Sequence, residues 1–445
     1  MATGVWLTTD AARHDPPGTS RAARPLLVLL LDGVAYERIR GLYDAGHFRR
    51  FQPPARLISV FPTLTDPAYD LLFGTGPTPG YEARYFDRQA NRMPRVLSTY
   101  LRGQNEAWVR KVDYRLSFLK DAIMYLLPKW VYRSELRHAR RVLDKCLAAG
   151  NGPVVLYILS TDGLAHMLRP EEIDAHLVRL DEWLERAVTD HDGELEVVML
   201  SDHGLGRLPP GCTRLERFNL GAVLRATGLR LVKRLRRPGD VALPLFGLLD
   251  LARLHTHDAA TREHAIAALR TRPEIEVLAA RDGDRLQVYA RDATALVRCR
   301  RDDAGLAWYS YEPVQGDPLR LADACAVLRS TGRMDADGFA TPSAWLAVTA
   351  DQDFPAAPSR LWEGLFSLCR EQPDIVVSLT ERWYVGSGLL SRFVRMQGTH
   401  GGLHRRATET FAMTTRLNLP SPLDLRQLGQ CLRREFGWPA GPASG

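Results

Sequence analysis

Short runs of aliphatic residues that stop abruptly at polar residues recur along the chain. Residues 25–31 are followed by the letters DG, residues 154–159 by STDG, and residues 195–200 by SDHG. Runs of this kind are typical of strands that are buried on both faces of a parallel sheet and lead into a loop. Residues 375–379 follow the same pattern, so we predict a fourth buried parallel strand there.

An amphipathic helix is predicted between the second and third of these runs. Pro170 suits the first helical position, and apolar residues follow it at helical spacing at positions 173, 177, 180, 184 and 188. Strands that alternate with amphipathic helices indicate an α/β fold, with a largely parallel sheet sandwiched by helices.

The pattern changes after about residue 270, where short apolar stretches are separated by tight turns. Residues 274–280, 286–290, 295–299 and 306–311 predict four short strands, and hence a small antiparallel β insertion. The predicted organisation is a disordered tail over 1–24, the first part of the α/β core over 25–270 with a basic and aromatic cap over 111–141, the insertion over 271–335, and the return of the core over 336–445.

Composition restricts the class of protein. A chain of 445 residues with 45% hydrophobic and 25% charged residues is an ordinary globular protein, which excludes disordered, collagenous and disulfide-scaffold classes. The net charge of +7 is weak evidence about partners over so long a chain. The six cysteines show no CxxC spacing, and no apolar run reaches the ~18 residues of a membrane span, so we expect a cytoplasmic protein. The sequence does not indicate an oligomeric state.

An acidic residue follows each of the first three predicted strands. These residues are Asp32, Asp162 and Asp202, and they can converge because the carboxyl ends of parallel strands meet at one edge of a sheet. His166 lies four residues after Asp162, and His203 directly follows Asp202. Carboxylate oxygen with imidazole nitrogen is a ligand set that suits Zn²⁺, and Mn²⁺ or Fe²⁺ less decisively.

Each of these residues taken singly has an ordinary structural explanation, since an aspartate after a strand is most often a helix cap or a turn former. Their joint occurrence favours a metal site. A further histidine, His400, stands among the glycines at 398, 401 and 402, a context that suits close approach of the backbone to a ligand.

Thr65 is the candidate nucleophile. It stands just before a segment that can start a helix, so its hydroxyl is expected near backbone N–H groups and the positive end of the helix dipole, which favours a phosphate. The alternative from the residues alone is a helix cap, with Asp66 and Pro67 behind it.

The motifs LDG, PTLTDPAYDLLFGTG, TDGLAH, SDHG and GTHGGL, in this order, resemble the alkaline phosphatase superfamily, and most closely its type I phosphodiesterase and nucleotide pyrophosphatase branch. They span residues 25 to about 415. The resemblance implies an alkaline-phosphatase-like α/β fold and two divalent metal ions, zinc in the first place and manganese as the alternative. It places Thr65, and not the nearby Thr63, as the nucleophile that forms a phosphothreonine. The implied ligands are Asp32, Asp202, His203 and Thr65 for one ion and Asp162, His166 and His400 for the other.

The chain departs from the family at the position of the phosphate-binding asparagine. That position falls near Ala83 or Arg84, so Arg84 or the displaced Asn91 is the candidate for its role. His404 is a candidate to support the metal ligands from behind, and Arg405 is a candidate anion contact.

The sequence therefore predicts a two-metal phosphoester hydrolase, in the first place a phosphodiesterase or nucleotide pyrophosphatase. Its expected substrate is a small phosphoester, a nucleotide or a lipid headgroup, and nucleic acid is not expected. The alternatives are a phosphomonoesterase or phosphonate hydrolase of the same superfamily and, in another class, a catalytically silent protein that binds phospholipid or nucleic acid. A sulfatase is disfavoured, because TDPAY stands where that branch needs a modifiable Cys or Ser.

Two basic segments have more than one interpretation. Within 111–141, basic and aromatic residues interleave, and Leu116, Leu119, Ile123 and Leu127 mark a face that we expect to pack inward in a cap or helix pair. Contact with nucleic acid or with a membrane surface is the second interpretation. Residues 230–237 are also basic and precede an apolar stretch, 241–251, for which we expect a buried helix beside a solvated charge run. Docking on a membrane surface toward a lipid phosphate substrate is the second interpretation for this segment.

Overall fold

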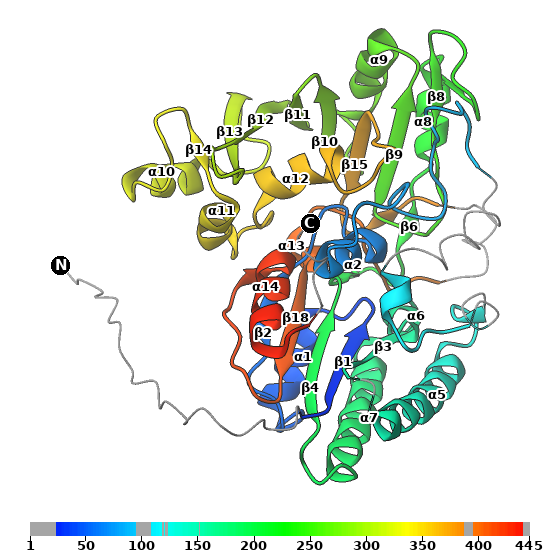
Figure 1. The fold of residues 1–445 in the computed structure, drawn as a ribbon. Coiled ribbons are helices and arrows are strands. Elements are labelled where there is room, and N and C mark those ends of the chain that lie inside the picture. The colour runs from blue at the N-terminus through cyan, green and yellow to red at the C-terminus, as the bar shows by residue number, and fades with distance from the viewer. Residues whose placement is uncertain are drawn as a thin grey trace.

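The computed structural model describes residues 24–94, 108–117, 120, 123–150, 152–386 and 395–438 (Figure 1). The predicted disordered tail lies outside the described residues except for Arg24, and so does Leu119 of the predicted cap. Among the described residues, no helix is both long enough and apolar enough to cross a bilayer.

The first sheet has six strands in the order β19-β2-β18-β4-β1-β3. The pairs β1–β3, β1–β4 and β2–β19 are parallel, and β18 is antiparallel to both of its neighbours, so β18 alone runs against the other strands of this sheet. The predicted largely parallel sheet is therefore confirmed. The strands are β1 (Leu26–Leu31), β2 (Ala55–Ile58), β3 (Val154–Ile158), β4 (Glu196–Ser201), β18 (Glu409–Thr414) and β19 (Leu423–Asp424).

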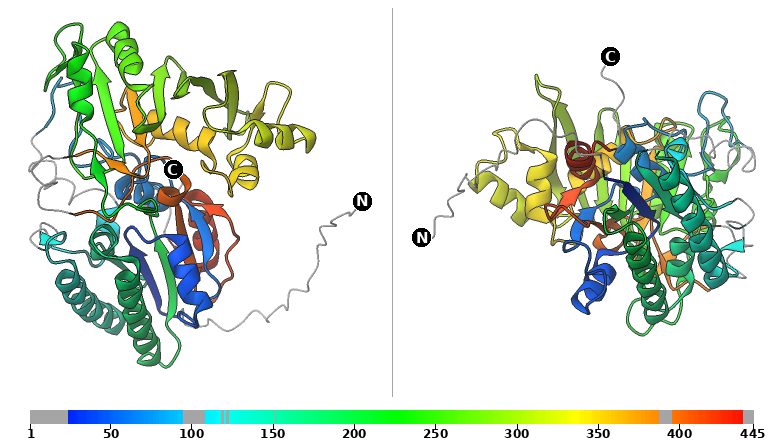
Figure 2. Two further views of the ribbon diagram at one scale, coloured as in Figure 1. Left: turned by 180° about the vertical axis from the view of Figure 1, so that it is seen from behind. Right: turned by 60° about the horizontal axis from the view of Figure 1, so that its bottom comes forward.

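Helices cover both faces of this sheet, because alternate residues of its strands point to opposite sides. Leu27, Leu29 and Leu31 share one buried apolar cluster with α1 (Tyr36–Asp44), α5 (Pro128–Ala149) and α7 (Pro170–Thr189). Leu26, Val28 and Leu30 face the other way, toward α2 (Thr65–Phe73) and α14 (Leu425–Phe436). Figure 2 shows the sheet between these two layers.

The second sheet has nine strands in the order β14-β13-β12-β11-β10-β15-β9-β8-β7, and all its neighbours are antiparallel except β7 and β8. The four strands predicted for the insertion are its β10–β13. The sheet is larger than that insertion, because it also takes strands from both sides of it in the sequence. Its strands are β7 (Arg230–Leu231), β8 (Asp240–Ala242), β9 (Leu251–Thr256), β10 (Ile275–Asp282), β11 (Arg285–Ala290), β12 (Ala293–Arg301), β13 (Ala307–Gln315), β14 (Phe339–Ala340) and β15 (Ile375–Leu379).

Two expectations about this region were wrong. Ile375–Leu379 is not a parallel strand of the first sheet: it is β15, antiparallel to both β10 and β9. A run that is apolar except for Ser378 indicates that a strand is buried on both faces, but it does not determine the sheet to which the strand belongs. Residues 241–251 form no helix but the end of β8, a turn and the start of β9, since Pro244 and Gly247 interrupt the segment.

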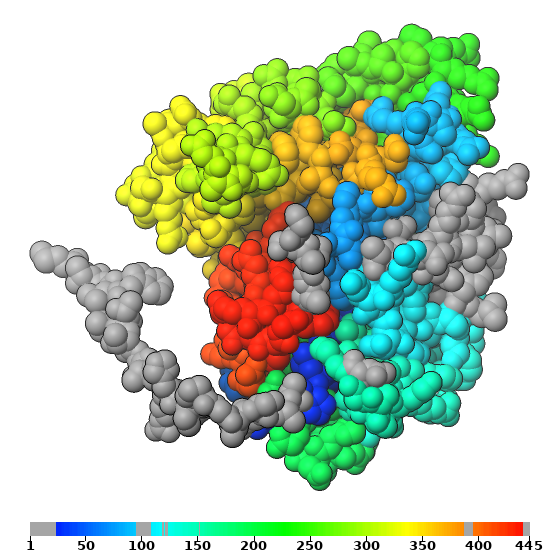
Figure 3. All heavy atoms as spheres, viewed as in Figure 1, coloured from blue at the N-terminus to red at the C-terminus, as the bar shows by residue number. Residues whose placement is uncertain are grey.

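One hydrophobic core joins the two sheets. The cluster that contains Val28 and Leu30 of β1 continues through Leu361 of α12 (Ala357–Phe366) to Val277 and Val288 of the second sheet. The sheets therefore form one packed body, and in Figure 3 the yellow and orange segments lie directly against the red and blue ones. The remaining elements are η1 (Val109–Lys111), α6 (Ser160–Met167), β5 (Gly206–Arg207), β6 (Glu216–Arg217), α8 (Leu220–Ala226), α9 (Ala259–Leu269), α10 (Ala322–Ser330), α11 (Pro342–Thr349), β16 (Trp383–Tyr384), β17 (Gly398–Thr399) and α13 (Arg405–Thr408).

Candidate metal centre

Strand register brings the three predicted carboxylates to one edge of the first sheet. Leu31, the last residue of β1, pairs with Ile158 of β3 on one side and Ser201 of β4 on the other. The residues that follow these strand ends therefore emerge together. Backbone contacts fix the corner, since Gly33 N donates to Asp202 Oδ1 over 3.2 Å.

The first ligand group consists of Asp32, Asp202 and His203, all buried, with ligand atoms within 4.8 Å of one another. His203 Nε2 lies 3.4 Å from Asp32 Oδ1 and 3.5 Å from Asp202 Oδ2. Thr65, the first residue of α2, donates its hydroxyl to Asp32 Oδ2 over 3.4 Å. The structure therefore places Thr65 beside this group, as the motifs implied.

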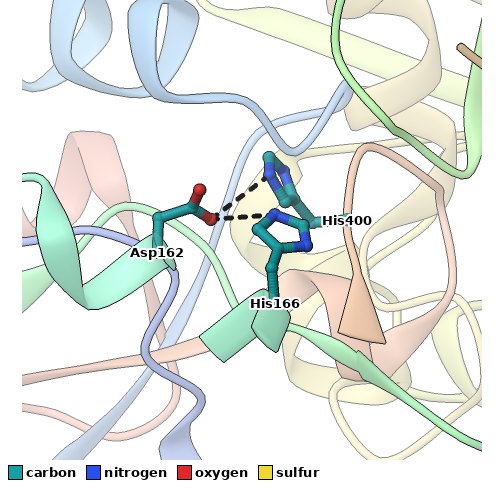
Figure 4. A group of neighbouring side chains, drawn as sticks. All are labelled: Asp162, His166 and His400. Atoms are coloured by element: carbon teal, nitrogen blue, oxygen red, sulfur yellow. Dashed lines mark ion pairs between the residues drawn. The ribbon is translucent and has the colours of Figure 1, made fainter. Parts of the chain in front are cut away.

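The second ligand group consists of Asp162, His166 and His400, also buried (Figure 4). Asp162 and His166 are one turn apart on α6, so they lie on the same helix face. Asp162 Oδ1 lies 3.0 Å from His166 Nε2 and 3.6 Å from Nε2 of His400, which enters from the loop after β17. The two groups hold all six predicted metal-binding carboxylates and imidazoles.

Unsatisfied polar atoms show that these groups fit divalent cations. Four buried ligand atoms have no hydrogen-bond partner among the described residues, and these are Asp32 Oδ1, Asp162 Oδ1, Asp202 Oδ2 and His203 Nε2. An uncompensated buried polar atom destabilises a fold, whereas a cation in each ligand group would satisfy all four atoms.

The three imidazoles are oriented for metal binding in the same manner. The Nδ1 atoms of His166, His203 and His400 bond the carbonyl oxygens of Gly398 (2.7 Å), Gly204 (2.9 Å) and Thr63 (2.8 Å). A carbonyl oxygen can only accept, so each Nδ1 carries a proton, and Nε2 is the nitrogen of each ring that faces the centre and would bind a cation.

Crowded charges perturb the protonation of the site. Burial, with the nearby carboxylates of Asp202 and Asp162, raises the pKa of Asp32 to about 8. Burial opposes a charge on His203, yet Asp202 and Asp32 raise its pKa to about 10. Burial and the adjacent His203, whose ring stacks on His400 with centroids 3.8 Å apart, lower the pKa of His400 well below its ordinary value. A dication would relieve the repulsion among the carboxylates.

A glycine makes room for the centre. Gly33 has φ 68°, and a Cβ at this position would lie 3.1 Å from Asp162 Oδ1 and 3.5 Å from His203 Cε1. Any side chain here would enter the space between the two ligand groups, which explains the glycine after Asp32.

Two tyrosines that the sequence analysis missed hold the outer carboxylate oxygens. Tyr157, at the end of β3, donates its hydroxyl to Asp32 Oδ2. Tyr125 donates to Asp162 Oδ2 over 2.8 Å. In each aspartate the other oxygen faces the ligand group. The position of Tyr157 in a strand that leads to a metal ligand was a usable signal, whereas nothing near Tyr125 in the sequence indicated Asp162.

The loop that carries His400 is held by two further residues. Thr63 Oγ1 accepts from Gly401 N over 2.7 Å, and its carbonyl accepts from the His400 ring. Asp250, fully buried, accepts from Gly402 N over 2.6 Å and donates its own N–H to the His400 carbonyl over 3.1 Å. Thr63 is therefore a structural support of the centre, and the sequence contained no signal for Asp250.

The other predicted site residues are placed as follows. His404 Nε2 bonds Asp250 Oδ2 over 2.8 Å. Burial opposes a charge on His404, but Asp250 raises the pKa of its ring to about 9. An ionic pair between the two residues therefore anchors the loop of His400. Arg405 pairs with Glu409 at 3.3 Å. Both ends of the Asn91 amide bond the backbone of Leu235, at 2.8 and 2.9 Å. These contacts account for Arg405 and Asn91 without a ligand.

Arg84 is half-buried, and its Nε has no hydrogen-bond partner among the described residues. No contact joins it to either ligand group within that part of the chain. Its role in phosphate binding stays a prediction.

Comparison with known proteins supports the fold. No family model and no curated protein matches the sequence. Among solved structures, murine ectonucleotide pyrophosphatase/phosphodiesterase 5 is 13% identical, with 94% of this chain and 97% of that chain covered at a TM-score of 0.50. The human protein of the same name is 12% identical, with 94% and 96% covered at 0.50. Phosphonoacetate hydrolase from Sinorhizobium meliloti is 14% identical, with 91% and 94% covered at 0.48.

The chain thus has the fold of the alkaline phosphatase superfamily. Within it, the fold is similar to that of the nucleotide pyrophosphatase and phosphodiesterase branch, and the resemblance carried by the five motifs is confirmed at the level of fold.

Proposed function

We propose that the chain is a two-metal-dependent phosphoester hydrolase that acts through a phosphothreonine on Thr65, in the first place as a phosphodiesterase or nucleotide pyrophosphatase. The observation that carries the proposal is the juxtaposition of two ligand groups, with four unsatisfied buried ligand atoms, and a threonine at the start of a helix. The names of the solved structures with the same fold support the phosphodiesterase class.

Bound divalent ions would lower the pKa of the Thr65 hydroxyl and offset the negative charge of the substrate. The chain itself supplies the orientation. Thr65 is held at the N-terminus of α2, where helix N–H groups favour phosphate oxygens, and its hydroxyl faces Asp32 Oδ2 as a proton acceptor. Attack of Thr65 Oγ1 on phosphorus breaks the bond to the leaving oxygen and forms phosphothreonine, which water then hydrolyses.

Asp32 and Asp162 keep their orientation through Tyr157 and Tyr125, so one oxygen of each remains available to a cation. The carbonyl partners of the three imidazoles hold a proton on Nδ1, so Nε2 is the nitrogen of each ring that a cation would bind in place of a proton. Zinc is the proposed metal, because a set of carboxylate oxygens and imidazole nitrogens suits it, with manganese as the alternative. We also propose a cytoplasmic location, which the six free cysteines support.

Hydrolysis assays with defined metals test this proposal. Purified chain is stripped of metal, reloaded with Zn²⁺, Mn²⁺ or Mg²⁺, and assayed with bis-p-nitrophenyl phosphate and p-nitrophenyl phosphate. We expect about two ions per chain and faster turnover of the diester. Preference for the monoester or for a phosphonate would support the alternative within the superfamily, and a metal-free, inert chain would refute the enzyme proposal.

A further inference from the structure

Three large apolar side chains are exposed together where the chain enters α5. Leu126, Leu127 and Trp130 have relative exposures of 62%, 53% and 51%. The prediction that this region packs inward is confirmed at Leu116, which is 2% exposed, but it is wrong for Leu127. Leu127 lies just before the first helical residue, so helical spacing does not determine its direction.

A basic stripe continues from these residues along α5. Arg133, Arg137 and Arg141 follow Trp130 at steps of three or four residues, so all four lie on one helix face, and all are exposed. None of the three arginines forms an ion pair within the described residues. Among the residues that the structure describes, nothing therefore compensates the positive charge of the stripe.

Asp144 of α5 and Glu172 of α7 are already paired with other cations. Asp144 bonds Arg140 over 2.8 Å, and Glu172 bonds Lys129 over 2.5 Å. They leave Arg133, Arg137 and Arg141 available to an external anion.

This surface is continuous with the metal centre. Met124 packs so closely on Gly163 of α6 that a Cβ on the glycine would lie 2.3 Å from Met124 Cγ, and Tyr125 bonds Asp162. The next two residues along the chain are the exposed leucines. Figure 1 shows α5 along the outer edge of the molecule, beside α7.

We propose that the surface formed by Leu126, Leu127, Trp130, Arg133, Arg137 and Arg141 docks on an anionic lipid bilayer. Tryptophan and leucine insert at the boundary of headgroups and acyl chains, while arginines in line with them contact lipid phosphates, so α5 would lie in the plane of the interface. Two exposed leucines favour lipid over nucleic acid, because an aliphatic side chain gains nothing from a phosphate backbone. This inference goes beyond the proposed hydrolase function and does not depend on turnover.

Vesicle sedimentation with the full chain tests the docking surface. We expect binding to vesicles that contain phosphatidylglycerol, much weaker binding to phosphatidylcholine alone, and loss of binding at high salt. An arginine beside such a surface contributes on the order of fivefold to partitioning, so R133Q/R137Q/R141Q should weaken binding on the order of 100-fold. L126S/W130S should weaken it at least roughly tenfold.

The matched control is L306S/V314S, which removes apolar side chains of 50% and 62% exposure from a different region and should leave binding unchanged. Thermal melts check that each variant is folded. If L126S/W130S does not fold, the test rests on R133Q/R137Q/R141Q. Equal binding to neutral vesicles, equal binding by all variants, stronger binding to single-stranded DNA, or a concentration-dependent dimer that L126S/W130S abolishes in the absence of vesicle binding would each overturn the proposal.

Discussion

The two ligand groups of the metal centre are assembled by different means. Asp32, Asp202 and His203 follow the ends of two adjacent parallel strands, so the hydrogen-bond register of the first sheet sets their positions. Asp162 and His166 share one helix, but His400 enters from a loop more than 230 residues later in the sequence. The geometry of the first group therefore depends on the register of a sheet. The geometry of the second group depends on the contacts that hold the loop of His400.

What holds that loop is a small set of buried polar contacts. Thr63 bonds both the His400 ring and the adjoining Gly401, while Asp250 bonds the backbone on either side of Gly401 and pairs with His404. The second group should therefore be the more sensitive of the two to substitutions that touch no ligand.

The largest effect is expected from Thr65→Ala, which removes the proposed nucleophile next to the first group. Loss of a nucleophile lowers kcat on the order of 10⁵-fold or more, while both ions should remain bound, because each group keeps its carboxylates and imidazoles. Steady-state kinetics and metal analysis measure both quantities. Thr75→Ala, just after the same helix, is the control, and near-normal activity of Thr65→Ala would eliminate the phosphothreonine.

The next effect is the loss of one ion when one ligand is removed. Asp202→Asn should empty the first group and His400→Ala the second, each reducing metal content from two ions to about one and activity by more than 100-fold, beyond the usual effect of residues that only support ligands. Titration with Zn²⁺ followed by metal analysis gives the count. If either variant lost both ions, the groups would not be separate sites.

A smaller and more selective effect is expected from Asp250→Asn. The amide keeps the size of the side chain but loses the charge that pairs with His404, so the His400 loop loosens. Removing such support weakens metal affinity 10–100-fold. Only the ion of the second group, held by Asp162, His166 and His400, should be affected. Competition with a chelator measures both affinities, with the exposed Asp303→Asn as control. An equal loss of affinity for both ions would contradict the difference between the two groups.

The smallest effects are expected from the tyrosines. Tyr157→Phe removes a buried hydrogen bond to Asp32, and Tyr125→Phe removes a half-buried one to Asp162. A hydrogen bond to a charged group contributes about 1.5–3 kcal/mol when buried, so the first change should lower kcat/KM about tenfold or more and the second less. A larger effect at Tyr125 would show that this tyrosine contacts substrate.

The strand-end ligands could be predicted because parallel strands deliver their following residues to one edge of a sheet. Asp32, Asp162 and Asp202 needed no knowledge of side-chain packing, and His166 and His203 were adjacent to them by helix or chain geometry. The same reasoning predicted the sandwich of helices and the strands β10–β13.

What could not be predicted depends on contacts between remote segments. The apolar sequence of Ile375–Leu379 shows burial but not the choice of sheet, so the strand was assigned to the wrong one. Asp250, Thr63 and Tyr125 act through partners that only the folded chain brings near. Neither periodicity nor local spacing encodes such pairings.

The hydrophobic cluster shared by the two sheets also determines how the molecule should unfold. Because Leu361 and Val277 belong to the same packed interior as Val28, we expect the two sheets to unfold together in one cooperative transition and not as separate units.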